Sequence, residues 1–385
     1  MNKKMCFIVT DAISFNILYR GQLEYLVANG FNLTLICGGS QSELFKLRAR
    51  RVGKVLDFGL VRQPNLWRDI LSFFRILFHL IKNRYEVVSV STPKAILLGS
   101  LAAYLTQQPR RLIFFQGRVY ENFRGIRRFL YISFDKIAIF LSTETLFVSR
   151  SLMDEFSKEI RSVKKRGVLL GHGSGNGISI EAFSPSAVSH SRISNLRQSL
   201  GILSSQMVVI IVGRICRDKG INEIREVADF LSSIKSEIKL LFVGSVEDEE
   251  SGAILKHLIA SGIAIHAGSV DDVIPFFALA DVHLFLSHRE GFGNVAIEAA
   301  AMGVPTLAFD VVGISDSVSD GITGYRFPFG DTKAVANAIR SMQRRRDYVR
   351  RAFTRARPWV VERFAQEHVW RKYLEFYANG GERLQ

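Results

Sequence analysis

Cysteine and proline are scarce in this sequence, with three cysteines and eight prolines among 385 residues. Cys6, Cys37 and Cys216 are widely spaced and form no CxxC or Cys/His pattern, which argues against a disulfide framework and a structural zinc site. Two of the three lie in apolar runs, so we expect reduced, buried thiols in a cytoplasmic protein. No tract rich in proline, glutamine or serine interrupts the chain, which indicates a folded globular protein.

Long apolar runs are also missing. The longest segments, 70–81 and 95–105, either fall short of the roughly 20 residues that span a bilayer or contain arginine and histidine. Near the start, lysines precede an apolar stretch, but Thr10 and Asp11 end it too early for a secretory signal. We therefore expect a first β-strand there and a protein that is not integral to a membrane.

Charge is distributed unevenly along the chain. Residues 1–180 contain 27 Lys and Arg against 12 Asp and Glu, whereas the remainder balances at 24 of each and the net charge is +15. Within that remainder, residues 344–372 are basic and residues 181–343 are net acidic. A basic field of this kind attracts phosphates, anionic lipid headgroups or nucleic acid, unless it is only a solvated surface without a partner.

The length and the apolar pattern predict two α/β domains. Short runs of Val, Ile, Leu and Phe alternate with amphipathic stretches, which is typical of βα units in a parallel sheet that is covered on both faces. The strands predicted in the first half are 5–9, 32–37, 86–90, 112–115 and 146–148, with helices at 16–28 and 126–140. The second half predicts strands at 207–212, 239–243, 263–267, 282–286 and 305–309, with helices near 219–234, 251–261, 272–280 and 294–302, and only helices from 331 onward.

A segment rich in glycine, serine and asparagine, 171–206, separates the two halves. We place one Rossmann-like domain at 1–185, a second Rossmann-like domain at 186–360, and a helix that crosses back to the first domain at 361–385. Ligands of such sheets bind at the carboxyl ends of the strands, so the site is expected in a cleft between the domains.

The first chemical motif is VGRICRDKGINEI, which follows the first strand of the second half. It places Gly213, Arg214, Lys219 and Gly220 at a strand-to-helix turn. Free backbone N–H groups and the helix dipole favour an anion at such a turn, and two cations there suit a diphosphate. An ordinary turn with surface charges is the alternative for this motif alone.

The second motif is HREGFGNVAIEAAAMGVP, from 288 to 305. Glu290 lies on the loop after a strand, Gly291 and Gly293 permit close approach of the backbone to a ligand, and Asn294 begins a helix that carries Glu298. Carboxylates accept hydrogen bonds from sugar hydroxyls, and the start of the helix suits a phosphate. A buried alanine-rich helix explains the alanines but not the two glutamates.

Together these motifs resemble the family-4 retaining glycosyltransferases of the GT-B fold, in which two Rossmann-like, doubly wound parallel-sheet domains face a cleft and the C-terminal helices pack back toward the first domain. The matching residues are Gly213-Arg214, Lys219-Gly220, Glu290-Gly291-Phe292-Gly293, Glu298, Asp320-Gly321 and Gly324. The likeness covers essentially the whole second half. Through 20–31, 91–103 and 171–183, the first half resembles a subgroup from bacterial capsule and O-antigen biosynthesis.

The resemblance implies that the domain 1–185 binds the acceptor and the domain 186–360 binds the nucleotide sugar. It also implies roles for individual residues. Arg214 and Lys219 would bind the donor diphosphate, Glu298 the ribose hydroxyls and Glu290 the donor sugar, so that Glu290, Lys219 and Arg214 form the catalytic set. The donor-binding residues implied are Gly21, Gln22, Gly213, Arg214, Lys219, Glu290, Gly291, Phe292, Gly293, Asn294, Val295 and Glu298.

Two positions depart from the family pattern. Gln116 stands where many members have a histidine, so a proton-transfer role is lost there, and we assign Gln116 with Arg118 to the acceptor side. The loop VGISD replaces the usual Gly-Gly-x-Pro-Glu, which puts contacts of Asp316 in doubt. The chain has no Asp-x-Asp motif and no histidine spacing typical of ligands, so we expect neither a metal nor a cofactor.

The expected reaction is retaining transfer of a hexose or N-acetylhexosamine-type sugar from a nucleoside diphosphate, with UDP expected, to a polyprenyl-diphosphate-linked saccharide of a surface polysaccharide. The Phe-rich, basic segment 66–84 suggests docking on an anionic membrane, peripherally on the cytoplasmic face of the plasma membrane, although these phenylalanines could equally be core. Nucleic acid is not an expected partner. The alternatives are a UDP-sugar 2-epimerase of the same fold and a non-enzymatic membrane-associated scaffold.

Overall fold

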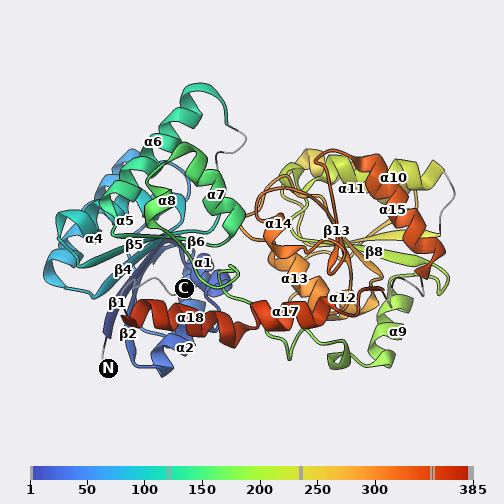
Figure 1. Cartoon of the computed structure of the whole chain (residues 1–385), viewed down its shortest axis with the longest axis horizontal. Coiled ribbons are helices and arrows are strands. Elements are labelled where there is room, and N and C mark those ends of the chain that lie inside the picture. Colours follow the sequence, from blue (N-terminus) through green and yellow to red (C-terminus); the bar gives the residue numbers. More distant parts are fainter. Residues whose placement is uncertain are drawn as a thin grey trace. The chain divides into compact units, whose positions relative to one another are not determined.

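The computed structural model describes residues 3–118, 120, 123–233, 237–346, 349 and 352–379, which form two compact units (Figure 1). The first unit comprises the chain up to Gly177 and from Glu367 onward, and the second is Ile178–Gln366. The chain thus passes from the first unit to the second inside the glycine- and serine-rich segment, before the expected boundary at 185/186. It passes back to the first unit within the expected final segment 361–385.

The first unit is built on a parallel sheet of seven strands in the order β3-β2-β1-β4-β5-β6-β7. Its central strands are continuous apolar runs because helices cover both faces of a parallel sheet. The strands are β1 (Lys3–Asp11), β2 (Phe31–Gly38), β3 (Lys54–Asp57), β4 (Val87–Ser91), β5 (Arg110–Phe115), β6 (Glu144–Phe147) and β7 (Gly167–Leu169).

Side-chain caps fix the starts of several helices in this unit, since Ser40, Asn65 and Ser149 each accept a backbone N–H of the following first turn. The last helix of the chain belongs here, and its Tyr373 and Tyr377 are fully buried. The helices are α1 (Ala12–Leu18), α2 (Gln22–Ala28), α3 (Gln41–Ala49), α4 (Leu66–Lys82), α5 (Pro93–Leu105), α6 (Gly125–Leu141), α7 (Arg150–Glu159), α8 (Val163–Arg166) and α18 (Gln366–Asn379).

The second unit repeats this architecture with a parallel sheet of six strands in the order β10-β9-β8-β11-β12-β13. The strands are β8 (Met207–Val212), β9 (Ile238–Val243), β10 (Ala264–His266), β11 (Val282–Phe285), β12 (Thr306–Phe309) and β13 (Gly324–Phe327). The helices are η1 (Pro185–Ala187), α9 (His190–Ser199), η2 (Arg217–Lys219), α10 (Ile221–Ser233), α11 (Glu249–Ala260), α12 (Ile274–Leu279), α13 (Asn294–Ala301), α14 (Ile314–Ser317), α15 (Thr332–Arg344) and α17 (Ala356–Phe364).

The ten predicted strands are confirmed to within about two residues at each end. Three strands were missed: β3 and β7, which are short and partly exposed edge strands, and β13, which has an exposed tyrosine. The predicted helix 16–28 is wrong as a single helix. It breaks after Leu18 because Gly21 has a φ of +80° and lies against the Trp370 ring, where a Cβ would come within 2.5 Å of a ring carbon.

The three cysteines are free and buried, in agreement with the expectation of reduced core thiols. Within the described ranges, no helix has both the length and the apolar character needed to cross a membrane. The two longest helices of the first unit, α4 and α6, each have 17 residues.

Candidate active site in the second unit

A close approach of two loops brings Lys219 to Glu290. The turn η2 follows β8 and ends at Gly220, which has a φ of +80°; a Cβ there would lie 2.1 Å from the carbonyl oxygen of Leu286. Only glycine permits this contact between the η2 turn and the carboxyl end of β11. As a result, the Lys219 ammonium forms an ion pair with the Glu290 carboxylate, although the two residues are 71 positions apart in sequence.

A second ion pair fastens the same two loops. Arg289 Nη2 donates to Asp218 Oδ2 at 2.6 Å, and the backbone N–H of His288 donates to the Asp218 carbonyl at 2.9 Å. Although burial alone would raise the pKa of the Asp218 carboxyl, the hydrogen bond and charge of Arg289 hold that pKa below its usual value. Asp218 and Arg289 therefore align the neighbouring Lys219 and Glu290.

His288 adds a further tie to helix α10. Its Nε2 lies 3.0 Å from a carboxylate oxygen of Glu223. Burial is the largest single influence and would raise the pKa of Glu223, but the contact and charge of His288, a backbone hydrogen bond and the charge of Arg217 together outweigh burial and lower this pKa. The sequence prediction missed Asp218, Glu223, His288 and Arg289. The available signal was the charge pattern RDKG and HREG, in which each motif residue has a neighbour of opposite sign.

Glycines determine the path of the loop 290–293. A Cβ on Gly313 would lie 2.5 Å from the Glu290 carbonyl oxygen, and a Cβ on Gly293 would lie 2.4 Å from Ser317 Oγ. The loop therefore runs directly against the segment before α14. The Phe292 side chain is buried, and its ring centroid lies 5.2 Å from that of Phe364. The ring of Phe292 is thus part of the core, and contact of its backbone with a ligand stays a prediction.

Glu298 lies on α13, between buried alanines that pack the helix into the core. The residue keeps part of its surface exposed, yet enough protein surrounds the carboxyl group that burial raises its pKa to about 7. No described residue hydrogen-bonds to this carboxyl group. Glu298 is thus a partly desolvated hydrogen-bonding group without a protein partner. At the helix start, Asn294 is exposed and Val295 half-buried.

Arg214 lies at the end of β8 and is 57% exposed. Its Nη1 contacts both carboxylate oxygens of Glu247, at 2.5 and 2.6 Å. Gly213 before it has a φ of +135°, and a Cβ on Gly244 would lie 1.9 Å from the Gly213 carbonyl oxygen. The ends of β8 and β9 therefore approach closely, and Arg214 has a surface partner when no ligand is present.

Comparison with known proteins points to the same chemistry as this arrangement of cations and carboxylates. The family model for glycosyl transferases group 1 matches residues 192–359. The capsular polysaccharide biosynthesis glycosyltransferase CapM of Staphylococcus aureus is 30% identical over 378 residues, which cover 98% of this chain and 97% of CapM. The chain belongs to the group 1 glycosyltransferases.

Two further proteins resemble this glycosyltransferase. The structure of Anabaena HepE in complex with UDP and glucose superimposes with a TM-score of 0.79 at 17% identity, covering 98% of this chain and 100% of HepE. The N,N'-diacetylbacillosaminyl-diphospho-undecaprenol alpha-1,3-N-acetylgalactosaminyltransferase of Campylobacter jejuni is 24% identical over 261 residues, 66% of this chain and 67% of that enzyme. The predicted GT-B fold and enzyme class are confirmed.

The predicted residues of the first unit of this glycosyltransferase lie in two settings. Gly21 lies beneath Trp370, as described above. Gln22 is fully buried and its Nε2 donates to the Gly175 carbonyl at 3.2 Å, so its side chain packs inside the unit rather than being presented to a phosphate. The donor contacts expected of Gly21 and Gln22 stay predictions.

Gln116 and Arg118 follow β5 but differ in exposure. The Gln116 side chain is half-buried and donates from Nε2 to the Tyr19 hydroxyl at 3.1 Å. Arg118 has a side chain that is only 1% exposed, forms an ion pair with Glu159 and lies over the Tyr120 ring at 4.6 Å. Arg118 therefore anchors α7, and its assignment to the acceptor side stays a prediction.

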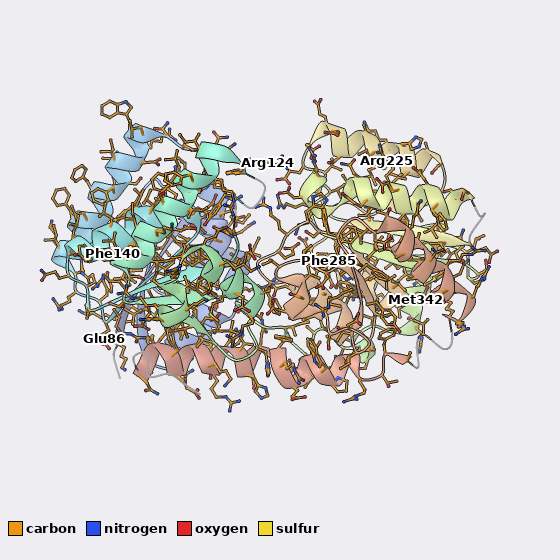
Figure 2. The ribbon with its side chains drawn as sticks, turned by 45° about the horizontal axis from the view of Figure 1, so that its top comes forward. Glu86, Arg124, Phe140, Arg225, Phe285 and Met342 are labelled. Carbon is orange, nitrogen blue, oxygen red and sulfur yellow. The ribbon has the colours of Figure 1, made fainter. Side chains whose placement is uncertain are left out.

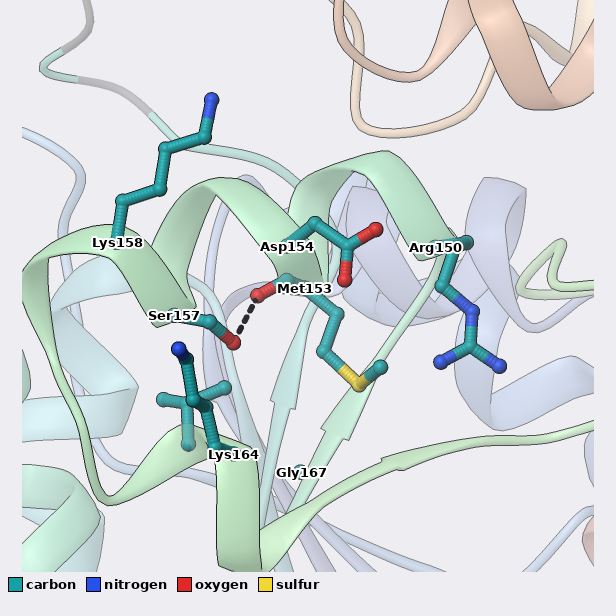
Figure 3. Close-up of a pocket in the computed structure, with 8 residues that line it drawn as sticks. Arg150, Met153, Asp154, Ser157, Lys158, Lys164 and Gly167 are labelled. Carbon is teal, nitrogen blue, oxygen red and sulfur yellow. Dashed lines mark hydrogen bonds between the residues drawn. The ribbon is translucent and has the colours of Figure 1, made fainter.

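Figure 3 shows a cavity of about 440 Å³ along α7 and α8. Two of its polar groups are engaged locally: Ser157 Oγ donates to the Met153 carbonyl at 2.8 Å, and Lys158 pairs with Glu155 at 2.6 Å. The side chains do not converge on one point, and the cavity is therefore a poor candidate for the site. In the part of the chain that the structure describes, no three His, Cys, Asp or Glu side chains gather as a metal site would require.

Proposed function

We propose that this glycosyltransferase moves a hexose or N-acetylhexosamine-type sugar from UDP to a lipid-linked saccharide, with retention of the anomeric configuration, in the assembly of a bacterial surface polysaccharide. The observation that carries the proposal is the Lys219–Glu290 ion pair on two tied loops, in the same unit as the unpartnered Glu298. The similarity to CapM supports a role in capsule assembly.

The donor is assigned to the second unit. A Lys219 ammonium has three N–H donors, so it can keep Glu290 and also bind a diphosphate oxygen, while Arg214 can leave its exposed partner Glu247 for the same anion. Glu298 would accept hydrogen bonds from the ribose hydroxyls, and Glu290 from the sugar. The HepE complex with UDP and glucose supports this choice of donor.

In the proposed step, the bond between the anomeric carbon and the diphosphate oxygen breaks. The acceptor hydroxyl oxygen bonds to the anomeric carbon on the same face, and its proton passes to the departing diphosphate oxygen. Lys219 and Arg214 stabilise the negative charge that develops on the diphosphate. They take the role that a divalent metal ion has in metal-dependent transfer reactions. The donor site is therefore proposed to work without a metal.

The acceptor is proposed to be a saccharide on a polyprenyl diphosphate. The Campylobacter jejuni relative acts on a diphospho-undecaprenol saccharide, which supports this class. The test is to incubate the full chain with UDP-sugars, with and without lipid-linked saccharide, and to identify products and their anomeric configuration by NMR. Product that forms only with the acceptor supports transfer, whereas donor consumption without acceptor to a free 2-epimer contradicts it.

Peripheral binding to an anionic membrane is proposed for α4 and α6. Both helices pack against α5 (Figure 1). Both also expose a stripe of apolar side chains to solvent, among them Phe140, which is labelled in Figure 2. The exposed apolar side chains are Leu66, Trp67, Ile70, Leu71, Phe74, Phe78 and Ile81 on α4, and Ile126, Phe129, Leu130, Phe134, Ile137 and Phe140 on α6. This corrects the alternative that the phenylalanines of 66–84 are all core, because Phe74 and Phe78 are exposed.

The positive charge of α4 and α6 favours an anionic membrane over other binding partners of this surface. Exposed cations lie along both stripes, namely Arg75 and Lys82 on α4 and Arg127 and Lys136 on α6. The acids of the two helices are neutralised or bound, since Asp69 pairs with Lys94 at 2.7 Å and Asp135 accepts the Tyr120 hydroxyl. Apolar side chains bordered by cations are the composition that binds anionic lipid surfaces.

A further inference from the structure

A cavity of about 420 Å³ lies at the carboxyl ends of β1, β2 and β3 in the first unit. These strands are neighbours in the sheet, and ligands of parallel α/β sheets bind at this edge. Asp11 contributes from the end of β1 and Ser40 from the loop after β2, while Arg62, Asn65 and Arg68 come from the loop after β3 and the first turn of α4. No residue predicted from the sequence motifs lines this cavity.

Cations outnumber carboxylates among the residues that line the cavity. Arg62 Nε lies 3.6 Å from Asp11 Oδ2, while the other oxygen of Asp11 accepts the backbone N–H of Ile13. The guanidinium of Arg68 has no partner among the described residues. The cavity is thus positive on balance, which favours an anionic ligand.

The segment that carries both arginines is held in place without a ligand. Lys94 Nζ donates to the Gln63 carbonyl and to Asp69 Oδ1, each at 2.7 Å. Asn65 accepts the backbone N–H of Arg68 at 3.1 Å, which caps α4. An ordered loop loses little conformational freedom when an anion binds, so its arginines can act as a formed site.

The same turn of α4 carries the apolar side chains Leu66 and Trp67, which are 73% and 81% exposed. Cations in a cavity beside exposed apolar side chains match a ligand that joins a phosphate to a hydrocarbon chain. We infer that this cavity binds the diphosphate of a prenyl-diphosphate-linked substrate through Arg62 and Arg68, while Leu66 and Trp67 contact the start of its prenyl chain. This inference rests on the proposed function, because it names the place where the lipid-linked acceptor is held.

The test measures binding of farnesyl diphosphate to the full chain by calorimetry, in saturating UDP so that the donor-diphosphate residues of the second unit are occupied. Inorganic pyrophosphate, farnesol and dihexanoyl phosphatidylglycerol serve as comparison probes. The variants are Arg62→Gln, Arg68→Gln and the double variant. The matched control is Arg84→Gln, an exposed arginine beyond the other end of α4.

We expect the double variant to bind farnesyl diphosphate about tenfold or more weakly, since each phosphate–guanidinium contact is worth a severalfold change in affinity. Arg84→Gln should bind as the wild type does. Pyrophosphate should bind more weakly than farnesyl diphosphate, and farnesol should not bind measurably. Circular dichroism and an unchanged affinity for UDP confirm that the variants are folded.

Equal affinity of the double variant and the wild type for farnesyl diphosphate would overturn the inference, as would farnesol binding as tightly as its diphosphate. Phosphatidylglycerol binding as tightly as farnesyl diphosphate would overturn the acceptor assignment and leave a site for bilayer headgroups. The outcome is separable from that of the proposed function. Absence of sugar transfer by the wild type would count against the reaction, whereas these binding measurements need no turnover.

Discussion

At the scale of single residues, Lys219 and Glu290 form the ion pair on which the proposed catalysis depends. In the proposed reaction the Lys219 ammonium binds the diphosphate. The Glu290 carboxylate binds the sugar and orients the Lys219 ammonium, so neither residue can replace the other. Both side chains lie on loops and neither fills the core. Their loss should therefore affect transfer more than stability.

We expect Lys219→Ala and Glu290→Ala each to lower kcat/KM for sugar transfer by about 100- to 1000-fold, the usual effect of removing a group that stabilises transition-state charge. The measurement is transfer of radiolabelled sugar, with thermal unfolding followed in parallel. Lys333→Ala, at an exposed lysine of α15, is a control that leaves both loops intact. Wild-type turnover in either site variant would contradict the assignment.

The raised pKa of Glu298 gives stability a defined dependence on pH. Because the folded pKa of about 7 exceeds the ordinary value of 4.5, the native state binds this proton more tightly than the unfolded chain does. The stabilisation is present below about pH 4.5 and is lost as the pH rises through about 7, with a cost on the order of 3 kcal/mol above that pH.

We therefore expect Glu298→Gln to raise the melting temperature relative to wild type at about pH 8, but not at about pH 4.5. The same substitution should weaken UDP binding, because an amide is a poorer acceptor for ribose hydroxyls than a carboxylate. Differential scanning calorimetry and calorimetric titration provide the two measurements. A stability difference that is identical at both pH values would show that Glu298 is not desolvated.

At the scale of elements, the strands and the two motifs were predictable because each is encoded locally. A buried parallel strand needs a run of apolar residues. A glycine-rich turn is recognised by the spacing of its glycines and charged residues along the sequence. The break between α1 and α2 was not predictable, because it depends on Gly21 meeting Trp370, a contact between distant parts of the chain. The same holds for Lys219 and Glu290, whose pairing requires Gly220 to touch Leu286.

The roles of buried polar residues were also beyond the sequence. Arg118 follows β5 and looked accessible, yet Glu159 and two aromatic rings take up its guanidinium. Gln22 stands beside a motif position, but its side chain faces the interior. Residue type and spacing give no information about which side of a loop a side chain occupies. Such assignments required the packed structure.

The apolar stripes of α4 and α6 lead to a prediction for membrane binding. Phe78→Glu on α4 and Phe129→Glu on α6 should each lower the fraction that co-sediments with phosphatidylglycerol vesicles by about fivefold or more, since each large apolar side chain contributes about 1.5–3 kcal/mol when buried. Phe45→Glu is the matched control, because Phe45 is a similarly exposed phenylalanine on α3.

Binding of the wild type to vesicles should also weaken at high salt, because salt screens the attraction between the cations beside the stripes and the lipid headgroups, which reaches only about 10 Å at moderate ionic strength. Binding should be weaker on phosphatidylcholine vesicles as well, because their headgroups carry no net charge. If Phe45→Glu lowered co-sedimentation as much as Phe129→Glu, the surface would not be the docking site. Salt-resistant binding to neutral vesicles would remove the argument from charge.

At the scale of the whole molecule, charge and chemistry are divided between the two units. The basic excess of the chain lies in residues 1–180, which include α4, α6 and the arginine-lined cavity. The motif residues that match the glycosyltransferase signature lie in the second unit. We therefore expect donor binding to depend on the second unit, and lipid binding to depend on the first.

The complete account depends on Lys219, Glu290 and Glu298 of the second unit, and a crystal structure of the chain with a bound UDP-sugar tests it most directly. The account predicts diphosphate density against Lys219, ribose hydroxyls on the Glu298 carboxylate and the sugar beside Glu290. Nucleotide density elsewhere, with Glu298 uncontacted and the Lys219–Glu290 pair unchanged, would contradict it.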